Sequence, residues 1–106
     1  MSFGAARPGK PGKNRPAVVI SVDDLLSAAA SDLIVVVPIS SSRAPGPLRP
    51  VVTSEEGVDR PSVAVCRAIR SVGRGRLLRR VGAVTPATLA SVEECLSLVL
   101  GLRRQP

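Results

Sequence analysis

An arginine and a serine, placed at the ends of two apolar runs, are the residues of this chain best suited to chemistry. Arg15 precedes Pro16 at the start of the run at 15–21, RPAVVIS, and Ser40 closes the run at 33–40, LIVVVPIS. Because Pro16 restricts the residue before it to an extended backbone, it fixes the direction of Arg15. A planar guanidinium and a hydroxyl are both good partners for a phosphate. The pair therefore predicts a phosphate-binding site.

More polar groups follow directly after Ser40. Ser41, Ser42 and Arg43 offer two hydroxyls, a run of amides and another guanidinium, which together could cradle a phosphate. Each residue alone has a simpler explanation, since a serine that ends a strand is usually a turn residue and an arginine before a strand is usually surface charge. The combination of Arg15 with Ser40 favours the functional interpretation.

The residue types that are absent exclude several kinds of chemistry. The sequence has no His, Trp or Tyr, and Phe3 is its one aromatic residue. Ser-His-Asp and Cys-His hydrolysis are therefore excluded, zinc catalysis by nitrogen and sulfur ligands is disfavoured, and stacking of bases on aromatic platforms is unavailable. Any reaction has to use Arg, Lys, Asp, Glu, Ser or Thr, and we expect no cofactor.

The charge of the chain is strongly positive and unevenly distributed. It carries 15 Lys+Arg against 8 Asp+Glu, a net charge of +7, and the stretches at 1–15 and 60–80 contain basic residues but no acid. Such stretches favour binding of a polyanion or an acidic protein. A solvated surface that keeps a small protein in solution is the simpler explanation for a charge run taken alone.

The apolar and turn-forming residues predict a single domain made mostly of strands. The runs at 15–21 and 33–40 are predicted to be central strands, because both are apolar and rich in β-branched residues. The other predictions, in chain order, are a Gly- and Pro-rich loop at 1–14, a helical turn at 22–31, a loop at 41–50, an edge strand at 48–53, an acidic turn at 54–61, a strand at 62–69, a basic segment with a helical turn at 70–80, and a short strand at 81–84.

The clearest predicted element is a helix near the C-terminal end. Thr85 is a favourable N-cap, Pro86 suits the first helical position, and Gly101 suits the C-cap. The apolar stripe of this helix consists of Leu89, Val92, Leu96, Val99 and Leu100. Several short strands and one terminal helix indicate a small barrel-like sheet with the helix packed on it.

The two cysteines are predicted to be core residues, Cys66 on a strand and Cys95 on the terminal helix. Free thiols in a reducing compartment are favoured over a disulfide. No apolar run is long enough to span a membrane, and the N-terminal segment lacks the apolar region of a secretory signal. We therefore expect a cytoplasmic protein without a membrane partner.

The order of these segments resembles the MazF/PemK/Kid family of ribonuclease toxins. The similar segments are RPAVVIS, VVVPIS, SVAVCRAIRSV, RLLRRVGAVTPATL and the closing helix, within 15–102. The resemblance implies an SH3-like barrel of the MazF/Kid/CcdB type that forms a homodimer. It also implies metal-independent cleavage of single-stranded RNA, which leaves a 2′,3′-cyclic phosphate and a 5′-hydroxyl, and a MazE-like antitoxin whose acidic tail occupies the RNA groove.

The resemblance also assigns site residues. The catalytic arginine of the family, in its Arg-Pro pair, corresponds to Arg15, and the hydroxyl that ends a strand, commonly threonine, corresponds to Ser40. Candidate RNA-binding residues are Lys10, Lys13, Ser41, Ser42, Arg43, Arg70, Arg74 and Arg76. In this assignment the barrel domain occupies 15–102, with a basic loop at 1–14 before it and a tail at 103–106 after it.

Two departures from the family pattern stand near the beginning of the chain. Family members usually open with a strand that carries a Gly-Asp pair, whereas this sequence begins within the following loop, so we expect the first barrel strand to be missing. Either Met1 is then not the natural start, or this form is unstable and inactive without its partner. Some members also carry a glutamate shortly before the Arg-Pro pair, where this chain has KPGKN at 10–14. The alternatives to an active ribonuclease are a gyrase-directed toxin like CcdB, an inactive relic bound by its antitoxin, and a basic barrel that binds RNA without cutting it.

Overall fold

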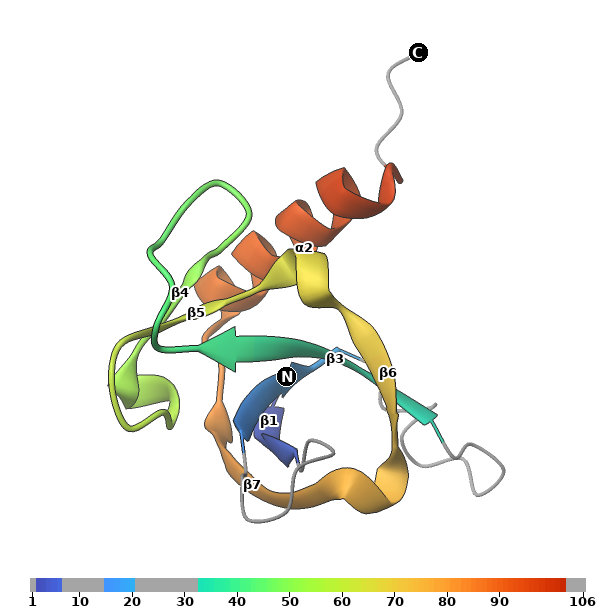
Figure 1. The fold of residues 1–106 in the computed structure, drawn as a ribbon. Helices are drawn as coiled ribbons and strands as arrows, with labels where there is room; N and C mark the ends of the chain where they lie inside the picture. The colour runs from blue at the N-terminus through green and yellow to red at the C-terminus, as the bar shows by residue number, and fades with distance from the viewer. Residues whose placement is uncertain (1, 7–14, 21–32, 103–106) are drawn as a thin grey trace.

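The computed structural model describes residues 2–6, 15–20 and 33–102, which form a strongly curved sheet with a helix across one side (Figure 1). The elements are, in chain order, β1 Ser2–Ala6, β2 Arg15–Val19, β3 Leu33–Ser40, β4 Val51–Val52, the 3-10 turn η1 Ser54–Glu56, β5 Ser62–Ala64, the 3-10 turn η2 Cys66–Ala68, β6 Arg70–Gly73, the 3-10 turn η3 Arg74–Arg76, β7 Leu77–Ala83 and α2 Pro86–Leu100. The strand order is β4-β5-β3-β2-β1-β7, and β6 also pairs with β3. The predicted mainly-β, barrel-like fold with a C-terminal helix is confirmed.

The central strand is β3, and its pairing defines where the site can lie. Along one edge it pairs with β2, with Ala17 opposite Pro38 and Val19 opposite Val36. Along the other edge its first half pairs with β6, and its last two residues pair with β5. The end of β3, at Ser40, therefore lies between β2 and β5.

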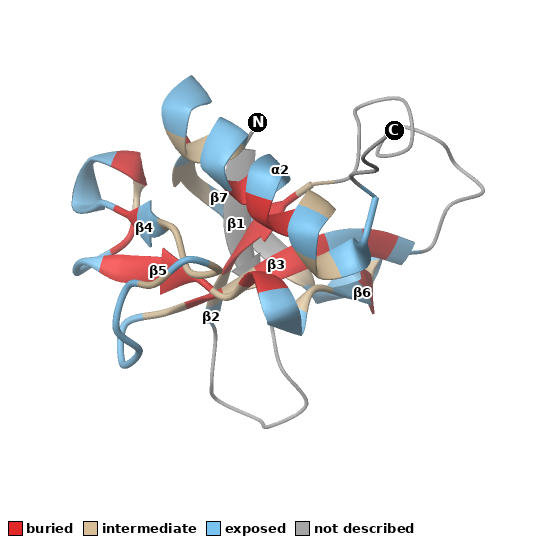
Figure 2. Ribbon diagram, turned by 90° about the horizontal axis from the view of Figure 1, so that it is seen from above, coloured by how far each residue is buried: buried red, intermediate tan, exposed pale blue. Residues whose placement is uncertain are grey.

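Both faces of the central strands are buried except at Leu33 and Val35 near the start of β3, and this burial explains their nearly continuous apolar sequence. One face packs against α2 in a cluster that contains Val18, Val37, Ile39, Val52, Val58, Ala64, Cys66, Val84, Val92, Cys95 and Leu96. The opposite face forms a second cluster of Ala17, Val19, Ile34, Val36 and Val72. Figure 2 shows buried segments along β3, β5 and the side of α2 that faces the sheet.

The helix α2 begins and ends where the sequence predicted. The Thr85 hydroxyl accepts a hydrogen bond from the Thr88 amide at 3.1 Å, Pro86 begins the helix, and Gly101 adopts a left-handed φ of 67°. Four members of the predicted stripe are buried or half-buried, namely Leu89, Val92, Leu96 and Val99. The prediction was wrong for Leu100, which is 50% exposed, because the end of the helix extends past the sheet (Figure 1).

A buried carboxylate connects η1 to the beginning of α2. Glu56 is 3% exposed and accepts hydrogen bonds from the Thr53 amide at 3.0 Å and from the Thr85 amide at 2.7 Å. Burial alone would raise the pKa of this carboxyl, but these two bonds and those from the hydroxyls of Thr88 and Thr53 outweigh burial and lower the pKa below its usual value. Gly82 permits the close packing, since a Cβ there would overlap the Glu56 backbone.

The first correction concerns the beginning of the chain. The sequence predicted a loop over 1–14 and a barrel without its opening strand, whereas Ser2–Ala6 form β1, which pairs with β2 and with β7. Composition averaged over 1–14 hid this strand, because the prolines and most glycines lie at 8–12. The backbones of β2 and β7 offer hydrogen-bond partners on both sides, and this pairing overrides weak strand propensity.

The second correction concerns the chain between the end of β5 and α2. The predicted strand at 62–69 ends at Ala64. The basic segment at 70–80 contains the predicted helical turn only as the short 3-10 turn η3, with β6 before it and the first part of β7 after it. Between the pairs Ile39–Ala64 and Val36–Arg70, β3 advances three residues while its partner chain advances six. The turn η2 takes up the difference, which no local sequence pattern reveals.

Some predictions fall outside the described residues. They are the helical turn at 22–31, the basic residues Lys10 and Lys13, and the tail at 103–106. Among the residues that the structure does describe, no helix has the length and apolar character needed to cross a membrane.

Candidate active site

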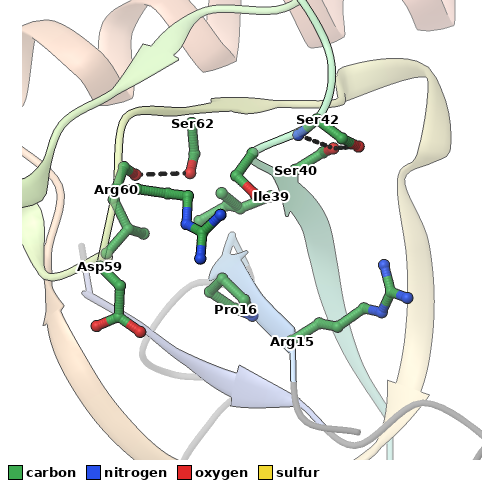
Figure 3. A pocket seen from close by; sticks show the side chains of 10 residues that line it. Arg15, Pro16, Ile39, Ser40, Ser42, Asp59, Arg60 and Ser62 are labelled. Carbon is green, nitrogen blue, oxygen red and sulfur yellow. Dashed lines mark hydrogen bonds between the residues drawn. The ribbon is translucent and has the colours of Figure 1, made fainter.

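Arg15 and Ser40 lie at the same end of the β2–β3 pair and on one face of the sheet. Ala17 is opposite Pro38, so two further residues along each strand bring Arg15 level with Ser40. Side chains alternate along a strand, which places both residues on the face that carries Ala17 and Val36, beyond the edge of that cluster. Both line one pocket of about 300 Å³ (Figure 3). The predicted pair therefore meets in space.

The pocket has a polar rim and an apolar centre. Its polar lining residues are Arg15, Ser40, Ser41, Ser42, Asp59, Arg60 and Ser62. Its apolar lining residues are Pro16, Ile39 and Val58, of which Pro16 and Ile39 lie between the polar groups of the two sides in Figure 3. Three segments that are distant in the sequence thus build the site: the start of β2, the turn after β3, and the segment between η1 and β5.

The serines after β3 fold back over the end of the strand. The Ser42 amide donates a hydrogen bond to Ser40 Oγ at 3.2 Å, and the two hydroxyl oxygens are 3.1 Å apart. Bonds of this kind stabilise a tight turn. Because Ser40 Oγ accepts the amide hydrogen, its own hydrogen is directed elsewhere, to Ser42 Oγ or to a bound anion. Arg43 follows this turn and is exposed, but it does not line the pocket.

Three polar pocket residues were missed by the sequence analysis, Asp59, Arg60 and Ser62. Ser62 is buried at the start of β5, and its hydroxyl donates a hydrogen bond to the Arg60 carbonyl at 2.8 Å. The Arg60 guanidinium points into the pocket, while the Asp59 carboxylate points away from that guanidinium (Figure 3). The sequence does contain a signal that could have identified Arg60. Like Arg15, it stands directly before a proline where a strand begins.

The other predicted RNA-binding arginines that the structure describes lie outside the pocket. Arg70 is on β6, and Arg74 and Arg76 belong to η3, and all three are exposed. The turn η3 leads into the end of β7 that pairs with β1, and β1 in turn pairs with β2 beside Arg15. Neighbouring strands are about 4.8 Å apart, so the backbone of Leu77, which directly follows η3, lies about 10 Å from that of Arg15.

The two thiols belong to the core. Cys66 and Cys95 are free and buried, as predicted, and Cys95 Sγ donates a hydrogen bond to the Pro47 carbonyl at 3.1 Å. Burial and the neighbouring Cys95 thiol raise the pKa of Cys66 to about 12, which makes it a poor nucleophile. Cys66 lies on η2 rather than on a strand. Among the described residues, no group of three His, Cys, Asp or Glu side chains could hold a metal ion.

Comparisons with known proteins agree on one family. A family model described as PemK-like, MazF-like toxin of type II toxin-antitoxin system matches residues 1–100. The chain is 37% identical over 103 residues to the endoribonuclease MazF9 of Mycobacterium tuberculosis (strain ATCC 25618 / H37Rv), an alignment that covers 92% of this chain and 86% of that protein.

Solved structures have the same fold. The Mycobacterium tuberculosis toxin MazF-mt6 superposes with a TM-score of 0.85 at 17% identity, covering 98% of this chain and 100% of that chain. An endoribonuclease in complex with its cognate antitoxin from a mycobacterial species gives a TM-score of 0.81 at 20% identity, covering 98% and 95%. A MazE-MazF structure from Deinococcus radiodurans superposes with a TM-score of 0.80 at 23% identity, covering 94% of this chain and 91% of that chain.

At these low identities the structural matches show the fold, while the family model and the relative at 37% identity show the family. The sequence resemblance is therefore confirmed across almost the whole chain, including both strands that lead to the pocket. This chain belongs to the PemK-like, MazF-like family of toxins of type II toxin-antitoxin systems.

Proposed function

We propose that this protein is an endoribonuclease toxin that cuts single-stranded RNA without a metal ion, with Arg15 and Ser40 as its catalytic residues. The observation that carries the proposal is the convergence of these two side chains, level across the β2–β3 pair, on one pocket. The relative MazF9 is named an endoribonuclease, which supports the same activity here. Messenger RNA is the first candidate substrate, followed by transfer and ribosomal RNA.

The proposed reaction is an internal transesterification of the RNA backbone. The 2′-oxygen attacks the adjacent phosphorus, a bond from phosphorus to the 2′-oxygen forms, and the bond from phosphorus to the 5′-oxygen breaks. The 2′-hydroxyl loses its proton to water, and the leaving 5′-oxygen takes up a proton. The products are a 2′,3′-cyclic phosphate and a 5′-hydroxyl.

Arg15 and Ser40 would act on the phosphate rather than on the proton of the nucleophile. A guanidinium keeps its proton throughout the physiological pH range and is therefore no base, but its N–H groups can bind two oxygens of the phosphorane. The Ser40 hydroxyl would donate a third hydrogen bond to that charge. Losing one preorganised donor of this kind typically lowers kcat by about 10² to 10³. Among the described residues, Asp59 is the one carboxylate that lines the pocket, and its orientation in Figure 3 does not favour a role as general base.

A MazE-like antitoxin with an acidic segment is the proposed protein partner. Carboxylates bind guanidinium groups in the same geometry as phosphates do, so an acidic tail in this pocket would exclude RNA. Two of the similar solved structures are named as complexes of such a toxin with its antitoxin.

We also propose a homodimer and a cytoplasmic location. The exposed leucines at the end of α2, Leu98, Leu100 and Leu102, are 50–67% exposed and are candidates for burial between subunits.

The decisive experiment is incubation of the purified protein with single-stranded RNA in EDTA. We expect fragments with a cyclic phosphate end, and a loss of at least about 10² in rate for Arg15→Ala. Arg67→Ala is the matched control, because Arg67 is exposed, carries the same charge and lies outside the pocket. Cleavage that disappears in EDTA, or that persists in Arg15→Ala, would refute the proposed mechanism.

The same assay separates the alternatives. A gyrase-directed toxin would leave RNA intact and inhibit DNA supercoiling by gyrase. A basic barrel without catalysis would bind RNA in a gel-shift assay and form no product. An inactive relic would do neither and would bind its antitoxin only.

A further inference from the structure

We infer that the pocket holds two consecutive phosphates of the RNA, with the phosphate to be cut at Arg15 and the neighbouring phosphate at Arg60. The inference rests on the proposed function, because it describes how the same site holds its substrate. Arg60 would be a positioning residue, since it binds RNA away from the reacting bond.

The two arginines approach the end of β3 from opposite edges. Arg15 stands at the beginning of β2, and Arg60 stands just before β5, and these are the strands on either side of Ser40. Figure 3 shows the consequence: Ile39 lies between the chain segments that carry the two arginines. Two guanidinium groups that are separated in this way can bind two anionic groups better than they can share one.

The surroundings of the two guanidinium groups also differ. The hydrogen-bonded hydroxyls of Ser40 and Ser42 lie on the Arg15 side of the pocket (Figure 3). The surface between the arginines is apolar, since Pro16 and Ile39 line the pocket and lie between its two polar sides in Figure 3. An apolar surface between two cationic ends suits the sugar or base that lies between two phosphates of a nucleic-acid chain.

The backbone of Arg60 is held in place, as a binding residue requires. The buried Ser62 hydroxyl donates its hydrogen bond to the Arg60 carbonyl at 2.8 Å. The proline that follows Arg60 restricts that residue to an extended backbone, as Pro16 does for Arg15. Because the bond to Ser62 involves only the backbone of Arg60, replacing the side chain leaves it intact.

The charge of the pocket supports a ligand with two negative groups. Of its lining residues that the structure describes, Arg15 and Arg60 are cationic and Asp59 is anionic. The Asp59 carboxylate points away from the Arg60 guanidinium in Figure 3, so it does not neutralise that group. One internal phosphodiester carries a single charge, and therefore two neighbouring phosphodiesters match the two guanidinium groups.

The test measures coupling between Arg60 and individual phosphates. The probe is a short fluorescent RNA with deoxyribose at the cleavage position, which prevents cutting, and with one phosphodiester at a time replaced by a neutral methylphosphonate. For the wild-type protein we expect about tenfold weaker binding when the phosphate next to the cleavage site is replaced. Arg60→Ala should bind the unmodified RNA about tenfold more weakly, and the same replacement should then cost less than about twofold.

Controls separate this role from a structural one. Arg67→Ala, outside the pocket, should keep the wild-type response to every methylphosphonate, and Arg60→Lys should restore part of the affinity but not the bidentate contact. In cleavage assays Arg60→Ala should raise KM about tenfold and leave kcat within about twofold. Thermal melting of Arg60→Ala should match the wild type.

Two results for Arg60→Ala would overturn the inference. The first is an effect of Arg60→Ala that is additive with every methylphosphonate, which shows no coupling to any phosphate. The second is a fall in kcat with an unchanged KM, which places Arg60 at the phosphate that is cut. If the wild type cuts no RNA, the proposed function fails. Binding measurements with a methylphosphonate at each position of the RNA in turn still test whether Arg60 contacts a phosphate. A wild type that binds no RNA overturns both.

Discussion

At the scale of single residues, the hydrogen bonds around Ser40 determine what a substitution there can do. The Ser40 hydroxyl both stabilises the turn, through the Ser42 amide, and faces the pocket. Ser40→Ala removes the donor, and we expect kcat for RNA cleavage to fall by about 10² or more. Ser40→Thr keeps the hydroxyl and suits a strand end, so its kcat should stay within about tenfold of the wild type.

Initial rates at saturating RNA measure this difference. Ser41→Ala is the matched control, because Ser41 lines the pocket without a hydrogen bond to the turn in the described structure. Equal losses for Ser40→Ala and Ser40→Thr would show that the presence of the hydroxyl does not determine the rate.

At the scale of elements, Glu56 is the connection between η1 and α2. Its pKa is lower in the folded protein than its ordinary value of 4.5, so the unfolded chain binds the proton more readily. The carboxylate therefore stabilises the fold fully above about pH 4.5, and this stabilisation is lost as the pH falls through the lower pKa of the folded state. Acid should loosen the contact between η1 and the N-terminal end of α2.

Glu56→Gln tests this linkage. The amide keeps the shape but weakens the bonds from the Thr53 and Thr85 amides, so we expect about 1–3 kcal/mol less stability at pH 7. The difference from the wild type should shrink as the pH is lowered towards 3. Urea unfolding at several pH values measures this difference in unfolding free energy. Glu55→Gln is the control, because Glu55 is exposed. A difference that is constant across this pH range would contradict the linkage.

At the scale of the whole molecule, the positive charge predicts a salt-dependent affinity for RNA. If about four phosphates are neutralised on a single strand, log K should fall with log salt at a slope of about −3. Replacing both Arg74 and Arg76 by Ala should weaken binding to all sequences and make this slope less steep by about 1 to 2. Fluorescence anisotropy in a series of salt concentrations measures both the affinity for RNA and the slope of log K against log salt. A flat dependence on salt would exclude the proposed electrostatic contact.

The exposed apolar residues predict a dimer. Besides the leucines near the end of α2, Leu33 and Val51 are 61% and 46% exposed on their strands. Burial of such surface against a second copy is the commonest arrangement for a small protein, and we expect sedimentation equilibrium at tens of micromolar to give the mass of a dimer. A single species with the monomer mass would rule out a homodimer in this range.

The sequence by itself determined the elements whose signals are local. The boundaries of α2 follow from Thr85, Pro86 and Gly101, because a helix cap is made by residues within one turn of each other. The strand at 33–40 was predicted with its bounds, since a continuous apolar run has to be buried on both faces. The family resemblance, which depends on the order of such segments, was also sufficient to identify the family.

The tertiary structure decided what depends on pairing between distant segments. The strand β1 forms because β2 and β7 lie on either side of it, and η2 forms because β5 and β6 occupy different lengths of β3. Pairing between distant segments also places Arg60 in the pocket. Arg60 is 20 residues from Ser40 in the sequence. Only the pairing of β5 with the end of β3 brings the two together, because the register between strands is a property of the whole sheet.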